Sequence, residues 1–121
     1  MMSDESNTDL KHRTKEFALR VIKLYSALPM STEAQVIGKQ ILRSGTSVGA
    51  QYREACRARS NAEFVSKMQS SLQELDETSY WLELLIEGRL VTAERLQCLQ
   101  DEANQLTAIF VASVKTAKSR K

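Results

Sequence analysis

The chain has 121 residues, of which 42% are hydrophobic and 26% are charged. This composition is typical of one globular domain and excludes a wholly disordered chain. No run of 18 apolar residues is present, and residues 1–9 are polar and acidic, so we expect neither a membrane span nor a secretory signal. One proline and four glycines leave little material for turns, which favours a few long helices.

The net charge of +2 conceals a segregation along the chain. Residues 1–60 contain ten Lys or Arg and six Asp or Glu, whereas residues 61–114 contain three and nine. The last seven residues add four basic side chains. Such a separation is typical of a nucleic-acid surface or of a self-interface between opposite charges, and the two remain open at this point. Cys56 and Cys98 match neither a zinc nor a redox spacing, which favours two half-buried thiols in a reducing cytoplasm.

The first predicted helix spans about residues 9–28. Thr8 can cap it, and Pro29 ends it because the residue before a proline disfavours helix. Apolar residues between them recur at spacings of three, four and seven, at Leu10, Phe17, Val21, Leu24 and Leu28. We expect the chain ends, roughly 1–8 and 116–121, to be frayed.

The second predicted helix spans about residues 32–59, with Ser31 or Thr32 at its start. Its core face carries Ile37, Ile41, Ser44, Val48, Tyr52 and Ala55. Three glycines, Gly38, Gly45 and Gly49, gather on one side of that face. Each glycine costs up to about 1 kcal/mol in a helix interior. We therefore expect another backbone to approach closely there, with a kink around residues 45–49 as the alternative.

A row of basic residues lies opposite the core of this helix. Lys39, Arg43, Arg53 and Arg57 form this basic stripe, which extends about 27 Å at 1.5 Å per residue. Arginine makes bidentate contacts with phosphate and carboxylate. No acid shares the stripe, although Glu54 lies just beside it. The stripe predicts a nucleic-acid-binding surface, helped by Lys115, Lys118, Arg120 and Lys121, and an ordinary solvated face is the alternative.

The third predicted helix spans about residues 61–87, from a Ser60–Glu63 capping box to Gly88. The fourth spans about residues 93–116 after Thr92, with a coiled-coil-like seam at Leu96, Leu99, Ala103, Leu106 and Phe110. Short connections between long amphipathic helices predict an all-α, antiparallel, up-down-up-down four-helix bundle.

Candidate chemistry is sparse. The only histidine, His12, has no Glu-x-x-His partner, and no glycine-rich phosphate loop is present. Glu74 and Glu77 are three residues apart and can in principle bind a hard cation, but a salt-bridged face with Arg43 or Arg57 is favoured. We therefore expect no enzymatic activity, no metal and no cofactor.

Two segments resemble a known family. They are QILRSGTSVGAQYREA (residues 40–55), continued by RARS and EF, and LQELDETSYWLELL (residues 72–85). They resemble the bacterial four-helix-bundle proteins first noted inside intervening sequences of 23S rRNA genes, and the accessory variability proteins of diversity-generating retroelements are similar. The resemblance covers roughly residues 10–115.

The resemblance implies an up-down-up-down bundle, a ring-shaped homopentamer, and binding of nucleic acid or protein partners without catalysis. The family usually has asparagine where this chain has Gln51. The family's motif positions fall here on Arg43, Ser44, Thr46, Ser47, Glu54, Arg57, Ser60, Phe64, Lys67, Glu74, Glu77, Tyr80 and Trp81.

Two functions follow as hypotheses. In the first, the basic stripe with Lys115 and Lys118 contacts RNA or DNA phosphates without strong sequence preference. In the second, the protein is an assembly module in which the arginines pair with acids of a neighbouring chain or of another protein partner. The expected interface residues are then Glu74, Glu77, Tyr80, Trp81, Gln51 and Glu54. Tyr80 and Trp81 can stack on bases, but a core or interface role is favoured.

Overall fold

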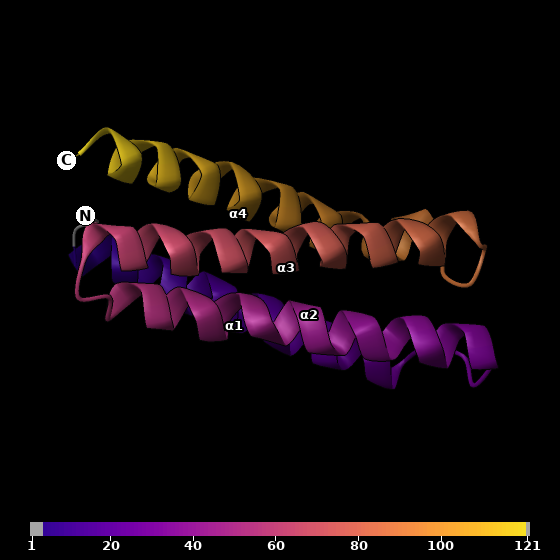
Figure 1. The fold of residues 1–121 in the computed structure, drawn as a ribbon. Helices are drawn as coiled ribbons and strands as arrows, with labels where there is room; N and C mark the ends of the chain where they lie inside the picture. The colour runs from indigo at the N-terminus through magenta and orange to yellow at the C-terminus, as the bar shows by residue number, and fades with distance from the viewer. Residues whose placement is uncertain (1–3, 121) are drawn as a thin grey trace.

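The computed structural model describes residues 4–120, with side chains from Thr8 onward, and contains four helices (Figure 1). They are α1 (Asp4–Ser26), α2 (Thr32–Cys56), α3 (Asn61–Glu87) and α4 (Ala93–Ser119). Short connections make successive helices antiparallel, and within the described range there is no strand. The expected all-α class and four-helix bundle are confirmed.

The helix ends differ from the expected ones at several points. α1 already begins at Asp4, so Thr8 lies inside it rather than at its cap. α2 ends at Cys56, three residues earlier than expected, because the N–H groups of Arg57 and Ala58 bond to Glu54 and Ala55 and tighten the last turn. α4 continues to Ser119, so residues 4–8 and 116–119 are helical rather than frayed; residues 1–3 and 121 lie outside the described range.

Side-chain caps fix two of the helix starts. Ser31 Oγ accepts a hydrogen bond from the Ala34 N–H, and Ser60 Oγ accepts one from the Glu63 N–H at 3.0 Å. Thr92 makes no such cap bond. At the end of α3, Gly88 itself stays in the helical region, and the left-handed residue is Arg89, with φ of 59°.

The glycine row of α2 packs against α1 inside the bundle. A Cβ atom on Gly45 would lie 2.8 Å from Val21 Cγ2, and one on Gly49 would lie 3.1 Å from Thr14 Oγ1. Gly38 faces Tyr25 and Leu28 in the same way. Close approach therefore explains these glycines, and α2 runs unbroken through residues 45–49 instead of kinking there.

The core lies along the axis between all four helices. Tyr52 of α2 and Phe110 of α4 stack across it with ring centroids 5.4 Å apart. Apolar side chains that are almost fully buried surround this pair, among them Phe17, Val21, Ile41, Val48, Met68, Leu75, Leu82, Leu85, Leu96 and Leu106. α1 contacts α4 far less than α2 contacts α3, so the four seams between helices are unequal. None of the helices in residues 4–120 is long and apolar enough to cross a membrane.

Candidate nucleic-acid interface

The basic stripe occupies the outer face of α2. Lys39, Arg43, Arg53 and Arg57 are all exposed, as is Ala50 between them. Because α2 is unbroken, Lys39, Arg43 and Arg53 keep the register that their spacing predicts, and Arg57 directly follows the last residue of the helix. Arg43 and Arg53 are ten residues apart, which places them about 80° apart around the helix. The two ends of the stripe therefore lean toward different neighbours.

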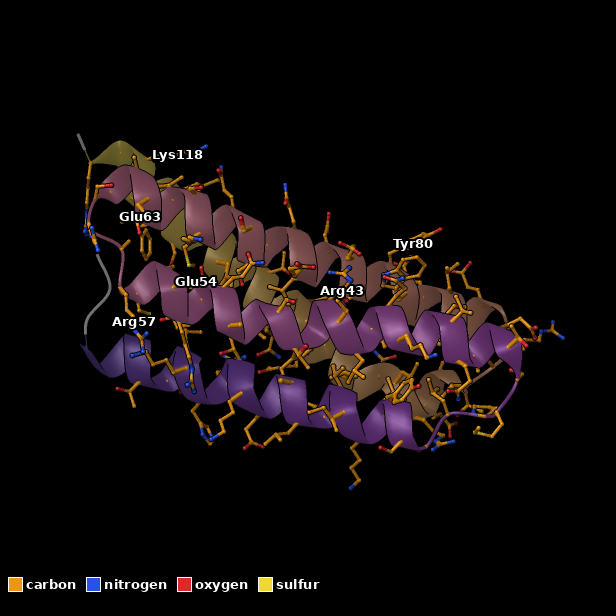
Figure 2. All side chains as sticks on the ribbon, turned by 60° about the horizontal axis from the view of Figure 1, so that its bottom comes forward. Arg43, Glu54, Arg57, Glu63, Tyr80 and Lys118 are labelled. Atoms are coloured by element: carbon orange, nitrogen blue, oxygen red, sulfur yellow. The ribbon has the colours of Figure 1, made fainter. Side chains whose placement is uncertain are left out.

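Arg43 leans toward α3 and is held there by two acids of the same chain (Figure 2). Its Nη1 lies 3.2 Å from Glu74 Oε1, and its Nη2 donates to Glu77 Oε1. The Arg43 side chain is 49% exposed, whereas that of Glu74 is only 15% exposed. This confirms the favoured interpretation of Glu74 and Glu77 as a face that is salt-bridged to Arg43. Arg43 belongs to the α2–α3 seam and is not an unpaired cation.

The residues expected at an oligomer interface also make contacts within the chain. Gln51 Nε2 lies 3.5 Å from Glu74 Oε2, and Glu54 Oε1 accepts a hydrogen bond from Lys67 Nζ at 2.8 Å. This hydrogen bond to the Glu54 carboxylate raises the pKa of Lys67. Tyr80 is 53% exposed and meets Trp81 edge to face at 5.1 Å, while Trp81 is half-buried against the core.

Buried hydroxyls lie beneath the charged part of the α2–α3 seam. Ser44 Oγ and Thr78 Oγ1 are 2.7 Å apart, and Ser71 Oγ donates to the Val48 carbonyl at 2.8 Å. All three side chains are fully buried. These bonds satisfy polar groups that are buried between α2 and α3, and they help to hold the two helices together.

Arg53 leans toward α1 and borders a groove between α1 and α2. The groove, of about 360 Å³, has Lys15 of α1 on its other side. Its remaining lining residues have short side chains; they are Thr14, Ala18, Thr46, Gly49 and Ala50. We call this the α1–α2 groove. In the described part of the chain, no acid lies within ion-pair distance of Lys15, Arg53 or Arg57.

The structure separates the basic residues of α4 from the stripe. Lys115 and Lys118 are exposed near the end of α4, which lies diagonally across the core from α2. Lys118 and Arg57 share one end of the bundle, on different sides of α3 (Figure 2). Arg120 is exposed at the same end, and Lys121 lies outside the described residues.

Lys15 is the residue that sequence reasoning missed. A signal for it existed, because Gly49 predicts a close helix neighbour and Lys15 directly follows the threonine that Gly49 contacts. The sequence does not show which helix that neighbour is. The described residues contain no cluster of acids, histidines or cysteines able to hold a metal ion. Burial raises the pKa of Tyr52, which keeps this core phenol protonated.

Comparisons with known proteins agree with this architecture. The family model described as "23S rRNA-intervening sequence protein" matches residues 6–112. A crystal structure of a protein with unknown function from the S23 ribosomal protein family of Bacteroides thetaiotaomicron is similar, with a TM-score of 0.82 and 40% sequence identity. The match covers 87% of this chain and 97% of that one. A comparison with curated proteins gave no match. The chain therefore belongs to the family of 23S rRNA-intervening sequence proteins.

Proposed function

We propose that this protein binds the phosphate backbone of RNA or DNA, without catalysis and without strong sequence preference, through the face formed by α1 and α2. One observation carries the proposal. Lys15 and Arg53 border the α1–α2 groove, Arg57 extends the basic row one turn further, and none of the three is paired with an acid in the described chain.

The floor of the groove supports the same function. Gly49, Ala50 and Ala18 have little or no side chain, so a backbone phosphate can approach α1 and α2 closely between the two cations. Contacts of this kind go to phosphate oxygens and carry no base information, which favours binding of many sequences. We propose that this binding takes place in the cytoplasm.

Assembly into a ring of five chains, which the family resemblance implies, belongs to the same proposal. A ring repeats the basic face, and repeated weak contacts along one nucleic-acid strand add to overall affinity. Pairing of the basic stripe with Glu74 and Glu77 of a neighbour does not suit this assembly, because Arg43 already binds both acids within the chain. The copies must meet through other surfaces.

Charge reversal tests the nucleic-acid interface. We expect Lys15→Glu with Arg53→Glu to weaken binding of a labelled generic RNA by at least roughly tenfold at low salt, since two phosphate contacts are lost and two repulsions added. Fluorescence anisotropy at several salt concentrations measures this effect. The wild type should show log Kd rising with log salt by about 0.7 to 0.9 per phosphate contact, and the variant should show a smaller slope.

Arg43→Gln is the matched control, because it removes a cation from the same helix that is already neutralised. It should change RNA affinity by less than about twofold, as expected for loss of a screened, paired charge. Circular dichroism checks that each variant keeps its helices. Equal binding by the double variant and the wild type would refute the interface, as would a larger loss from Arg43→Gln than from the groove variant.

A further inference from the structure

The seam between α1 and α4 is closed at one end and open at the other. Arg13 of α1 makes a bidentate pair with Glu102 of α4, with Nη2–Oε1 at 2.7 Å and Nε–Oε2 at 3.0 Å. This hydrogen bonding raises the pKa of Arg13. Further along the seam, toward the α1–α2 connection, the two helices leave a groove of about 320 Å³.

This α1–α4 groove combines an apolar floor with cations at its border. Leu24, Ala27, Leu96 and Leu99 form the floor. Three cations line its border: Arg20, Lys23 and Arg95. In the described residues, none of them has an acid within ion-pair distance. Arginine and lysine beside an apolar floor, in which Leu24 and Ala27 are the more accessible residues, favour an occupant that carries both carboxylates and an apolar side chain.

The same chain carries a surface of that chemistry on α3. Asp76, Tyr80, Glu83 and Glu87 follow one another at spacings of four, three and four, so they share one face of the helix. All four are exposed, and the three acids have no ion-pair partner in residues 8–120. This acidic stripe is about 16 Å long at 1.5 Å per residue, and Tyr80 is its apolar member.

The two surfaces lie at the same level of the bundle. The groove is formed by the end of α1 and the start of α4, and the acidic stripe is the second half of α3. The α1–α2 and α3–α4 connections are at the same end of the molecule (Figure 1). A copy placed side by side, without sliding along the bundle axis, therefore brings its acidic stripe level with the groove.

We infer that the α1–α4 groove receives the acidic stripe of a second copy of this chain, an inference that rests on the assembly part of the proposed function. Carboxylates of the stripe pair with Arg20, Lys23 and Arg95, and Tyr80 packs on the leucines of the floor. The contact joins two different surfaces, so every copy keeps one groove and one stripe for further neighbours. Because both surfaces lie level, the contact adds no translation along the bundle axis, which suits the ring of the proposed function.

Two complementary variants test this contact. The first, Arg20→Glu with Arg95→Glu, makes the groove acidic; the second, Asp76→Lys with Glu83→Lys, makes the stripe basic. In each variant alone, the groove and the stripe carry charges of the same sign. We therefore expect self-association to weaken by at least roughly a hundredfold. Mixed in equal amounts, the two variants match groove with stripe only when they alternate, so they should associate again as pairs and open chains, because a ring of five cannot alternate two kinds of chain. Analytical ultracentrifugation of the separate and mixed proteins measures the masses.

The outcomes separate this contact from the rest of the proposal. Reassembly on mixing cannot come from misfolded variants, and Arg59→Glu, an exposed reversal elsewhere, should leave the oligomer intact. A monomeric wild type would overturn both the assembly and this contact. An oligomer that survives both reversals, or a mixture that stays monomeric, would overturn the contact while leaving assembly standing. RNA binding through Lys15 and Arg53 is measured independently of all three results.

Discussion

The two edges of α2 each carry an arginine, but the two arginines have different surroundings and different roles. Along the edge that faces α3, Arg43 is bound by two acids, and hydroxyl groups are hydrogen-bonded beneath it. Along the edge that faces α1, Arg53 stands over glycine and alanine with no acid near it. An arginine is structural or available for a ligand according to which neighbouring helix it leans toward, and the residue type alone does not decide this.

The edge that faces α1 should be the most sensitive to added volume. In Gly45→Leu, the new Cβ would lie 2.8 Å from Val21 Cγ2, with three more carbons to place. Overpacking of this kind costs about 3 kcal/mol, and the gain in helix propensity returns at most about 1 kcal/mol. We expect a net loss of about 2 kcal/mol in the free energy of unfolding, measured with urea. Ala50→Leu, on the exposed face of the same helix, is the control and should be neutral.

The edge that faces α3 should respond to the loss of a hydroxyl. Thr78→Val keeps the shape of the side chain and removes the bond to Ser44, which retains its bond to the Gln40 carbonyl. We expect a loss of about 1 kcal/mol in the free energy of unfolding. Thr107→Val is matched in shape, but Thr107 bonds only a carbonyl of its own helix. A loss from Thr107→Val as large as that from Thr78→Val would show that the α2–α3 hydroxyl pair has no special role.

The ion pairs above these hydroxyls should matter least for stability. Arg43→Gln breaks the contacts with Glu74 and Glu77, and partly exposed pairs of this type contribute about 0.5 kcal/mol. The loss should shrink in high salt, because ions screen the pair. Thermal unfolding of Arg43→Gln and of Arg53→Gln at two salt concentrations compares the two edges directly. If Arg53→Gln destabilised the protein as much, the proposed difference between them would be wrong.

Most of the fold was predictable because its signals are local. Ser60 with Glu63 determines the start of α3 through a hydrogen bond within a few residues. Pro29 indicates the end of α1 only approximately, since the helix ends at Ser26, two residues earlier than expected. The boundaries that were missed lack an equally clear signal in the sequence. Thr8 has the right chemistry for a cap, yet the helix already begins at Asp4. α2 stops at Cys56, where the N–H groups of Arg57 and Ala58 bond to carbonyls three residues back.

The candidate site was predictable only in part. Spacing placed Lys39, Arg43, Arg53 and Arg57 on one exposed face, and the structure keeps them there. The spacing did not reveal which side of α2 would face α1. It therefore did not distinguish the paired Arg43 from the unpaired Arg53, and it did not identify Lys15. The glycine row predicted that another helix packs closely there, but it did not show which helix. A sequence pattern gives the angle of a residue around its own helix and does not identify the neighbouring helix.

Gly49 affects both the packing of α1 and the shape of the groove, so these two properties change together. Its missing side chain lets Thr14 of α1 pack against α2, and the same absence keeps the floor of the α1–α2 groove low. A bulkier residue at this position would shift α1 and raise that floor in a single step. Position 49 therefore couples the packing of α1 against α2 to the shape of the surface between Lys15 and Arg53.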